Sequence, residues 1–136
     1  MKVFTYGSLM FPEVWRRVAG AAQVGIPARL SGYEARCLAG QTYPALVESA
    51  HSLTEGVLYQ EVNAVSLRAL DAFEGGFYRR REVFVTAGGL EIPAWVYAAA
   101  DSRHPDILPE KWCAEDFSAR HLTGFLRHDP GFSGTR

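Results

Sequence analysis

The first 18 residues bring an apolar run, a glycine-serine loop and a helix start together in immediate succession. Val3–Thr5 is typical of a short strand, and residues 11–18 open with a Pro-Glu pair that favours a first helical turn. In the loop between them, Gly7 can turn the chain at a backbone geometry that other residues resist, and Ser8 supplies a hydroxyl. Because the first N–H groups of a helix lack intrahelical partners, this loop predicts a site for a carboxylate, a phosphate or an oxyanion. The same residues also fit an ordinary strand-to-helix turn, since no lysine or second glycine completes a phosphate loop.

The length and composition predict one domain with a single core. The chain has 136 residues, 48% of them hydrophobic, and no Pro/Gly/Ser-rich linker is long enough to separate two domains. We expect the domain to span residues 1–128 and a flexible tail to follow over residues 129–136. The periodic segments place eight apolar side chains in the expected core: Phe4, Val57, Leu58, Leu70, Phe73, Val83, Val85 and Val96.

Charge and cysteine content favour a cytoplasmic protein that binds small molecules. The formal net charge of −1 gives no electrostatic basis for binding nucleic acid or an acidic membrane surface. No apolar run approaches the roughly 20 residues of a membrane span, and the N-terminus enters a short strand instead of a signal peptide. Cys37 and Cys113 lack a Cys-x-x-Cys spacing and the histidines are scattered, so we expect a reducing compartment and no metal site.

Alternating apolar patterns predict a mixture of strands and helices. Asn63 favours a helix N-cap, and the glycine pair after Glu74 ends the helix that follows it. The Gly-Gly pair at residues 88–89 favours the turn of a hairpin, and Pro27 favours an edge position for its strand. We expect strands over residues 3–5, 23–30, 33–38, 42–47, 55–62, 77–86 and 90–100, and helices over residues 11–18, 63–74 and 109–127.

A second group of reactive side chains lies where the helix over residues 63–74 ends. Asp71 and Glu74 are neighbours on one helical surface. Glu74 also falls at the negative end of the helix dipole, among aromatic residues that can remove it from water, and both effects raise the pKa of a carboxylate. A glutamate of this kind suits proton transfer near neutral pH, whereas Asp71 is expected to matter chiefly to local structure. The alternative for Glu74 is a surface carboxylate paired with Arg79 or Arg81.

Six short motifs occur in an order and spacing that resemble the gamma-glutamylcyclotransferase-like family, and most nearly its AIG2-like and gamma-glutamylamine cyclotransferase branch. The motifs are Tyr6-Gly7-Ser8-Leu9, Tyr43-Pro44-Ala45, Gly56-Val57-Leu58-Tyr59, Leu70-Asp71-Ala72-Phe73-Glu74-Gly75, Tyr78-Arg79 and Trp112-x4-Phe117. The resemblance extends from Val3 to about Phe125. It implies an α+β fold with a small, mostly antiparallel β-barrel flanked by helices, in which the Tyr6–Leu9 loop and the glutamate meet at one pocket.

The resemblance also implies roles for individual side chains. The loop holds the gamma-glutamyl part of the substrate, and the glutamate is the general acid/base. In this sequence the substrate-binding residues are then Tyr6, Gly7, Ser8, Leu9 and Tyr78, the last orienting the glutamate, and the general acid/base is Glu74.

Family members with assigned activity cyclise gamma-glutamyl compounds to 5-oxoproline and release an amine or amino acid. The expected function is therefore a transferase that acts on a gamma-glutamyl amine or peptide. Because the nucleophile belongs to the substrate, no cofactor or metal is expected. The alternative is a non-catalytic module that keeps the same pocket for a carboxylate-bearing metabolite, and the presence of Glu74 favours the enzyme. The leaving amine and the oligomeric state stay open at this stage.

Overall fold

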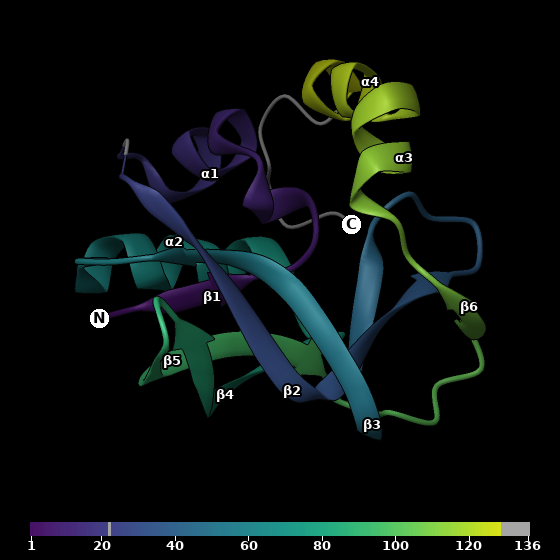
Figure 1. The fold of residues 1–136 in the computed structure, drawn as a ribbon. Helices are drawn as coiled ribbons and strands as arrows, with labels where there is room; N and C mark the ends of the chain where they lie inside the picture. Colours follow the sequence, from purple (N-terminus) through teal and green to yellow (C-terminus); the bar gives the residue numbers. More distant parts are fainter. Residues whose placement is uncertain (22, 129–136) are drawn as a thin grey trace.

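Two long strands, β2 (Gly25–Leu38) and β3 (Pro44–Tyr59), form an extended antiparallel pair that curves across the molecule (Figure 1). The structure is a computed structural model that describes residues 1–21 and 23–128. Each long strand replaces two shorter ones expected from the sequence. In β2 the chain passes Gly32 at φ +84° with a shift of register and does not turn back, and β3 stays paired to it along most of its length.

Strand pairing closes a five-stranded barrel. Strand β1 (Val3–Thr5) is antiparallel to β3 and parallel to β5 (Leu90–Ala99), which forms a hairpin with β4 (Tyr78–Ala87). Strand β4 meets β2 at the Arg29–Thr86 pair, and this contact completes the ring β3-β1-β5-β4-β2. The expected α+β class with a small, mostly antiparallel barrel is therefore confirmed. The edge position expected from Pro27 is wrong, because β2 has neighbours on both sides.

Two helices cover one side of the barrel, α1 (Pro12–Ala19) and α2 (Ala64–Glu74) (Figure 1). The predicted boundaries of α2 are confirmed. The side chain of Asn63 accepts a 2.8 Å hydrogen bond from the backbone N–H of Ser66, and Gly75 ends the helix at φ +72°. The Ser66 hydroxyl donates a 2.6 Å hydrogen bond to the carbonyl of Ala19, which joins α2 to the end of α1.

The C-terminal part differs from the single helix expected over residues 109–127. Pro109 lies in an additional strand, β6 (Ile107–Lys111), which pairs with β2. Two short helices follow, α3 (Ala114–Arg120) and α4 (Leu122–His128). The helix begins only after β6 because Cys113 is extended, and its sulfur accepts a hydrogen bond from Asp116 N–H. The predicted tail over residues 129–136 lies outside the described residues.

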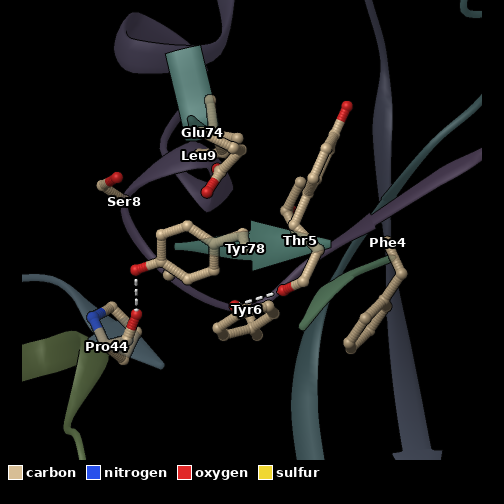
Figure 2. Close-up of a pocket in the computed structure, with 10 residues that line it drawn as sticks. Phe4, Thr5, Tyr6, Ser8, Leu9, Pro44, Glu74 and Tyr78 are labelled. Atoms are coloured by element: carbon tan, nitrogen blue, oxygen red, sulfur yellow. Dashed lines mark hydrogen bonds between the residues drawn. The ribbon is translucent and has the colours of Figure 1, made fainter. Parts of the chain in front are cut away.

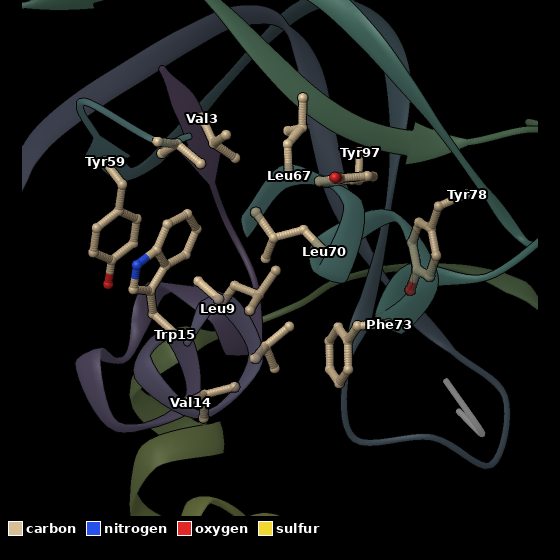
Figure 3. Packing of buried hydrophobic residues seen from close by; sticks show 13 residues of the cluster. Val3, Leu9, Val14, Trp15, Tyr59, Leu67, Leu70, Phe73, Tyr78 and Tyr97 are labelled. Carbon is tan, nitrogen blue, oxygen red and sulfur yellow. The ribbon is translucent and has the colours of Figure 1, made fainter. Parts of the chain in front are cut away.

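Alternation along the strands divides most of the buried side chains into an outer layer and a barrel interior, and a third, smaller cluster includes Leu38, Tyr43 and Ala99. On β1, Val3 packs with the helices outside the barrel, whereas Phe4 packs with residues of all the barrel strands and so fills the interior. The outer layer, shown in Figure 3, includes Trp15 stacked on Tyr59 with ring centroids 3.9 Å apart. Of the expected core residues, six are buried and two, Val57 and Val83, are half-buried; the six are Phe4, Leu58, Leu70, Phe73, Val85 and Val96. In the described part of the chain, no helix is long and apolar enough to cross a membrane.

Candidate active site

A pocket opens where the end of β1, the end of α2 and the start of β3 meet (Figure 2). The loop at residues 6–9 and Glu74, distant in sequence, line this pocket together, and their expected convergence is observed. The full lining is Phe4, Thr5, Tyr6, Gly7, Ser8, Leu9, Pro44, Glu74, Tyr78 and Tyr97. Every residue singled out from the sequence as substrate-binding or catalytic is in this set. Their chemical roles stay predictions.

The start of the loop is held by a hydrogen bond to β5. It leaves β1 at Thr5, and the phenol of Tyr6 donates a short hydrogen bond to the backbone carbonyl of Tyr97 on β5. The short 3-10 helix η1 (Ser8–Met10) follows, and the side chain of Ser8 is buried at its start. Backbone N–H groups at the start of such a turn have no intrahelical acceptor and can bind an anionic oxygen.

Gly7 lies against Pro44, and this close approach limits which residue can stand at position 7. Its φ of −119° is not positive, although its ψ of −139° lies outside the main β region. A Cβ at this position would lie 2.9 Å from Cδ of Pro44 and 3.0 Å from its Cγ. The loop therefore contacts the first residue of β3 directly, and a larger residue at position 7 would push the two apart.

Glu74 is the last residue of α2 and is only 8% exposed. The alternative of a surface carboxylate is wrong, because Glu74 is buried. Arg81, one of the two partners expected in that alternative, pairs with Glu48 at 3.1 Å. The break in the helix at Gly75 lets the chain turn into β4, so the carboxylate stays at the pocket wall while the strand continues elsewhere.

Tyr78, the first residue of β4, is buried, and its phenol donates a 2.6 Å hydrogen bond to the carbonyl of Pro44 (Figure 2). The bond ties the segment after Glu74 to the residue that contacts Gly7. The two walls of the pocket are thereby joined through β3.

Tyr97 was not expected at the site from the sequence. Its phenol donates a 2.6 Å hydrogen bond to Oδ1 of Asp71, and the Asp71 carboxylate also accepts one bond from Arg80 at each of its two oxygens. Burial, the bond to Asp71 and the charges of Asp71 and Glu74 raise the Tyr97 pKa, although Arg80 opposes the shift, so the phenol keeps its proton. The signal that could have found it is the alternation of β5, which places Tyr97 on the opposite face from Val96.

The small closed barrel flanked by helices is the fold of gamma-glutamyl cyclotransferase-like structures. The chain belongs to the family described as gamma-glutamyl cyclotransferase, AIG2-like, whose model matches residues 3–114. The family fold supports a gamma-glutamyl cyclotransferase-like activity in general.

Relatives and solved structures agree with this assignment. Protein AIG2 A of Arabidopsis thaliana is 30% identical over 128 residues, which cover 91% of this chain and 74% of that protein. Protein AIG2 B of the same plant is 28% identical, over 96% of this chain and 78% of that protein. A solution structure from Arabidopsis thaliana has a TM-score of 0.74 at 27% identity, covering 95% of this chain and 79% of that one. A solved gamma-glutamyl cyclotransferase shares the fold, with a TM-score of 0.60 at 22% identity over 74% of this chain and 67% of that chain.

Proposed function

We propose that the protein is a cyclotransferase that converts a gamma-glutamyl amine or gamma-glutamyl peptide to 5-oxoproline and the free amine. The observation that carries the proposal is the buried carboxylate of Glu74 in the same pocket as the loop at residues 6–9. A binding module has no need of a buried proton-transfer group at this place, because burying a carboxylate is unfavourable unless its surroundings compensate.

The first step is a proton transfer. The α-amine of a gamma-glutamyl compound is the nucleophile, but near neutral pH it is protonated and unreactive. Glu74 accepts this proton, and the free amine attacks the γ-carbonyl carbon to form the new C–N bond of a five-membered ring. Because the ring closes within one molecule, the task of the pocket is to hold the chain bent with the two atoms in reach.

Attack turns the γ-carbonyl oxygen into an oxyanion. The backbone N–H groups at the start of η1 and the Ser8 hydroxyl are the donors that we assign to it, or to the substrate α-carboxylate. Collapse of the intermediate breaks the bond to the leaving nitrogen, and Glu74 returns a proton to that nitrogen. The ring nitrogen also gives up its second proton, by way of Glu74 or solvent, to the departing amine, which leaves as an ammonium ion. One C–N bond forms, one breaks, and the protons balance without an oxidant or reductant.

The walls of the pocket support this chemistry. Tyr6, Leu9 and Tyr78 are buried side chains that restrict access of water to Glu74. Exclusion of water strengthens hydrogen bonds to a developing negative charge, and it also prevents bulk water from competing for the Glu74 carboxylate.

The test is the formation of 5-oxoproline from a panel of gamma-glutamyl compounds, followed by mass spectrometry. The panel holds gamma-glutamyl amino acids, gamma-glutamyl-ε-lysine and other gamma-glutamyl amines, each also incubated without enzyme to measure spontaneous cyclisation. We expect at least one compound to release 5-oxoproline and the amine in equal amounts. Saturable binding of these compounds without turnover would instead assign the pocket to a binding module.

A further inference from the structure

Asp71 lies one turn before Glu74 on α2, and its carboxylate reaches across to the β4–β5 hairpin. Oδ1 accepts a 2.6 Å bond from the Tyr97 phenol and a 2.9 Å bond from Arg80 Nε, and Oδ2 accepts a 3.2 Å bond from Arg80 Nη2. Arg80 and Tyr97 are directly opposite each other in the hairpin, so their side chains share one face. A single carboxylate thus joins the last turn of α2 to both strands.

The two partners of Asp71 are themselves held in place. The guanidinium of Arg80 lies over the ring of Trp95, 4.5 Å from its centroid, and both of its bonds to Asp71 come from one side of its planar group. Tyr97 is only 4% exposed and lines the pocket. Arg80 and Tyr97 are thus held by contacts that do not involve Asp71. Their bonds to Asp71 therefore hold the end of α2 in place.

Tyr97 continues the connection to the opposite wall. Its phenol binds Asp71, while its backbone carbonyl accepts the hydrogen bond of the Tyr6 phenol. Tyr6 is the first residue of the loop at residues 6–9. The chain of contacts therefore runs from the turn that carries Glu74, through Asp71, Tyr97 and Tyr6, to the loop on the other side of the pocket.

We propose that Asp71 is a positioning residue of the active site, which sets the place of Glu74 relative to the Tyr6–Leu9 loop through its bonds to Tyr97 and Arg80. The inference rests on the proposed function for its kinetic consequence. Its structural consequence, the coupling of the α2 end to the loop, does not depend on any reaction. Because a misplacement of about 1 Å can lower turnover on the order of 10²-fold, a contact of this kind affects the rate although Asp71 does not line the pocket between Glu74 and the loop.

The kinetic test is a double-mutant cycle of Asp71→Ala and Tyr97→Phe. Tyr97→Phe removes one hydrogen bond to a charged partner and should lower kcat about 10-fold, with KM changed less than about twofold. Asp71→Ala removes this bond and both bonds from Arg80, so it should lower kcat at least as much. Since both substitutions break the bond between Asp71 and Tyr97, the double variant should lose little more than Asp71→Ala alone. Asp71→Asn keeps an acceptor oxygen for the phenol of Tyr97, so it should recover part of the loss even if Asp71→Ala folds poorly.

The matched control is Glu48→Ala. Glu48 pairs with Arg81 at 3.1 Å, also on β4, but this pair is exposed and lies outside the pocket lining. Its loss should leave kcat within about twofold, as expected for an exposed ion pair. The positioning role would be overturned if the kcat losses of the two single variants multiplied in the double variant. It would also be overturned if Glu48→Ala lowered kcat as much as Tyr97→Phe.

The second measurement needs no substrate. Amide hydrogen exchange of Met10 and Phe11, whose N–H groups bond to Gly7 and Ser8, reports the order of the loop. Asp71→Ala and Tyr97→Phe should each accelerate this exchange about 5–10-fold, and Glu48→Ala should not. If the wild type forms no 5-oxoproline from any compound, the proposed function fails and this exchange decides the inference alone: unchanged exchange in both variants would overturn it.

Discussion

The phenol of Tyr78 and the carbonyl of Pro44 are joined by a 2.6 Å hydrogen bond. Both groups are buried, and Pro44 is also the residue that leaves no room for a side chain on Gly7. Pro44, at the start of β3, therefore contacts both β4, through Tyr78, and the loop at residues 6–9, through Gly7. The geometry of the pocket depends on this contact as well as on the helix that carries Glu74.

Tyr78→Phe should lower the free energy of unfolding by about 1–3 kcal/mol, because it removes the donor from a buried carbonyl oxygen. Denaturant unfolding followed by tryptophan fluorescence measures the change. Tyr33→Phe is the matched control, since it removes the hydroxyl of a half-buried side chain on β2, and we expect a change within about 0.5 kcal/mol. Equal stability of Tyr78→Phe and the wild type would show that the bond to Pro44 does not hold the pocket wall.

Gly7→Ala should destabilise the protein by roughly 1–3 kcal/mol and raise KM, because the new methyl group would meet the rigid ring of Pro44 at 2.9 Å. Gly76→Ala provides the control for stability. Nothing lies within 4 Å of a Cβ at position 76 and its φ is not positive, so the change should stay within about 0.5 kcal/mol. Unfolding midpoints of the two variants test the comparison, and a neutral Gly7→Ala would contradict the close-approach explanation.

The sequence predicted those parts of the fold that depend on local signals. Asn63 and Gly75 bound α2 as expected, because an N-cap side chain and a glycine at positive φ act within one turn of the chain. The continuity of β2 and β3, each of which was expected as two shorter strands, could not be predicted in the same way. Gly32 fits a tight turn as well as a bulge, and only pairing with a long partner strand decides between them.

The candidate site was predicted as far as its residues belong to contiguous motifs. Residues 6–9 and Glu74 could be found because each stands in a recognisable local pattern. Tyr97 was not found, because alternation along β5 gives only the face of its side chain, whereas its contribution depends on the register of the hairpin and on its opposite neighbour Arg80. For the same reason Asp71, expected to matter chiefly to local structure, binds a residue of the pocket.

Leu70→Ala should cost about 2–5 kcal/mol of stability, the usual range for truncating a fully buried leucine. Leu70 is 0% exposed in the outer layer between α2 and the barrel (Figure 3). Val65→Ala, on the same helix but 67% exposed, should change stability by less than about 0.5 kcal/mol. Chemical denaturation distinguishes the two, and a loss below about 1 kcal/mol for Leu70→Ala would contradict its burial.

Tyr59 should make stability depend on pH at the alkaline end. Burial, and secondarily the charge of Glu13, raises the Tyr59 pKa from 10 to about 12. Between these values the folded protein keeps a proton that the unfolded chain has lost. The contribution of Tyr59 is therefore fully present below pH 10 and is lost as pH rises towards 12, by at most about 1.4 kcal/mol per pH unit.

The measurement is a series of denaturant unfolding curves between pH 9 and pH 12, with the wild type compared to Tyr59→Phe. The phenylalanine variant should be less stable at neutral pH, because the phenol of Tyr59 donates a hydrogen bond to the carbonyl of Met10. Its stability should nevertheless fall less steeply with pH than that of the wild type. Parallel curves for the two proteins would contradict the raised pKa of Tyr59.

Glu74→Gln is the substitution that tests the proposed mechanism most directly. It preserves the size of the side chain and one acceptor oxygen, but it removes the group that takes the proton from the substrate amine. We expect a folded variant that still binds a gamma-glutamyl compound, since the loop at residues 6–9 is unchanged. Turnover should fall on the order of 10²–10⁴-fold, the usual contribution of a positioned acid or base.

Two measurements separate lost chemistry from lost affinity in Glu74→Gln. Calorimetric titration with a substrate that the wild type cyclises gives the dissociation constant, and release of 5-oxoproline gives the rate. Glu82→Gln, which neutralises an exposed carboxylate on β4, should leave both values within about twofold of the wild type. If Glu74→Gln retains near-normal turnover, another group must take the proton from the α-amine, and Glu74 is then a structural carboxylate that closes α2 at the pocket wall.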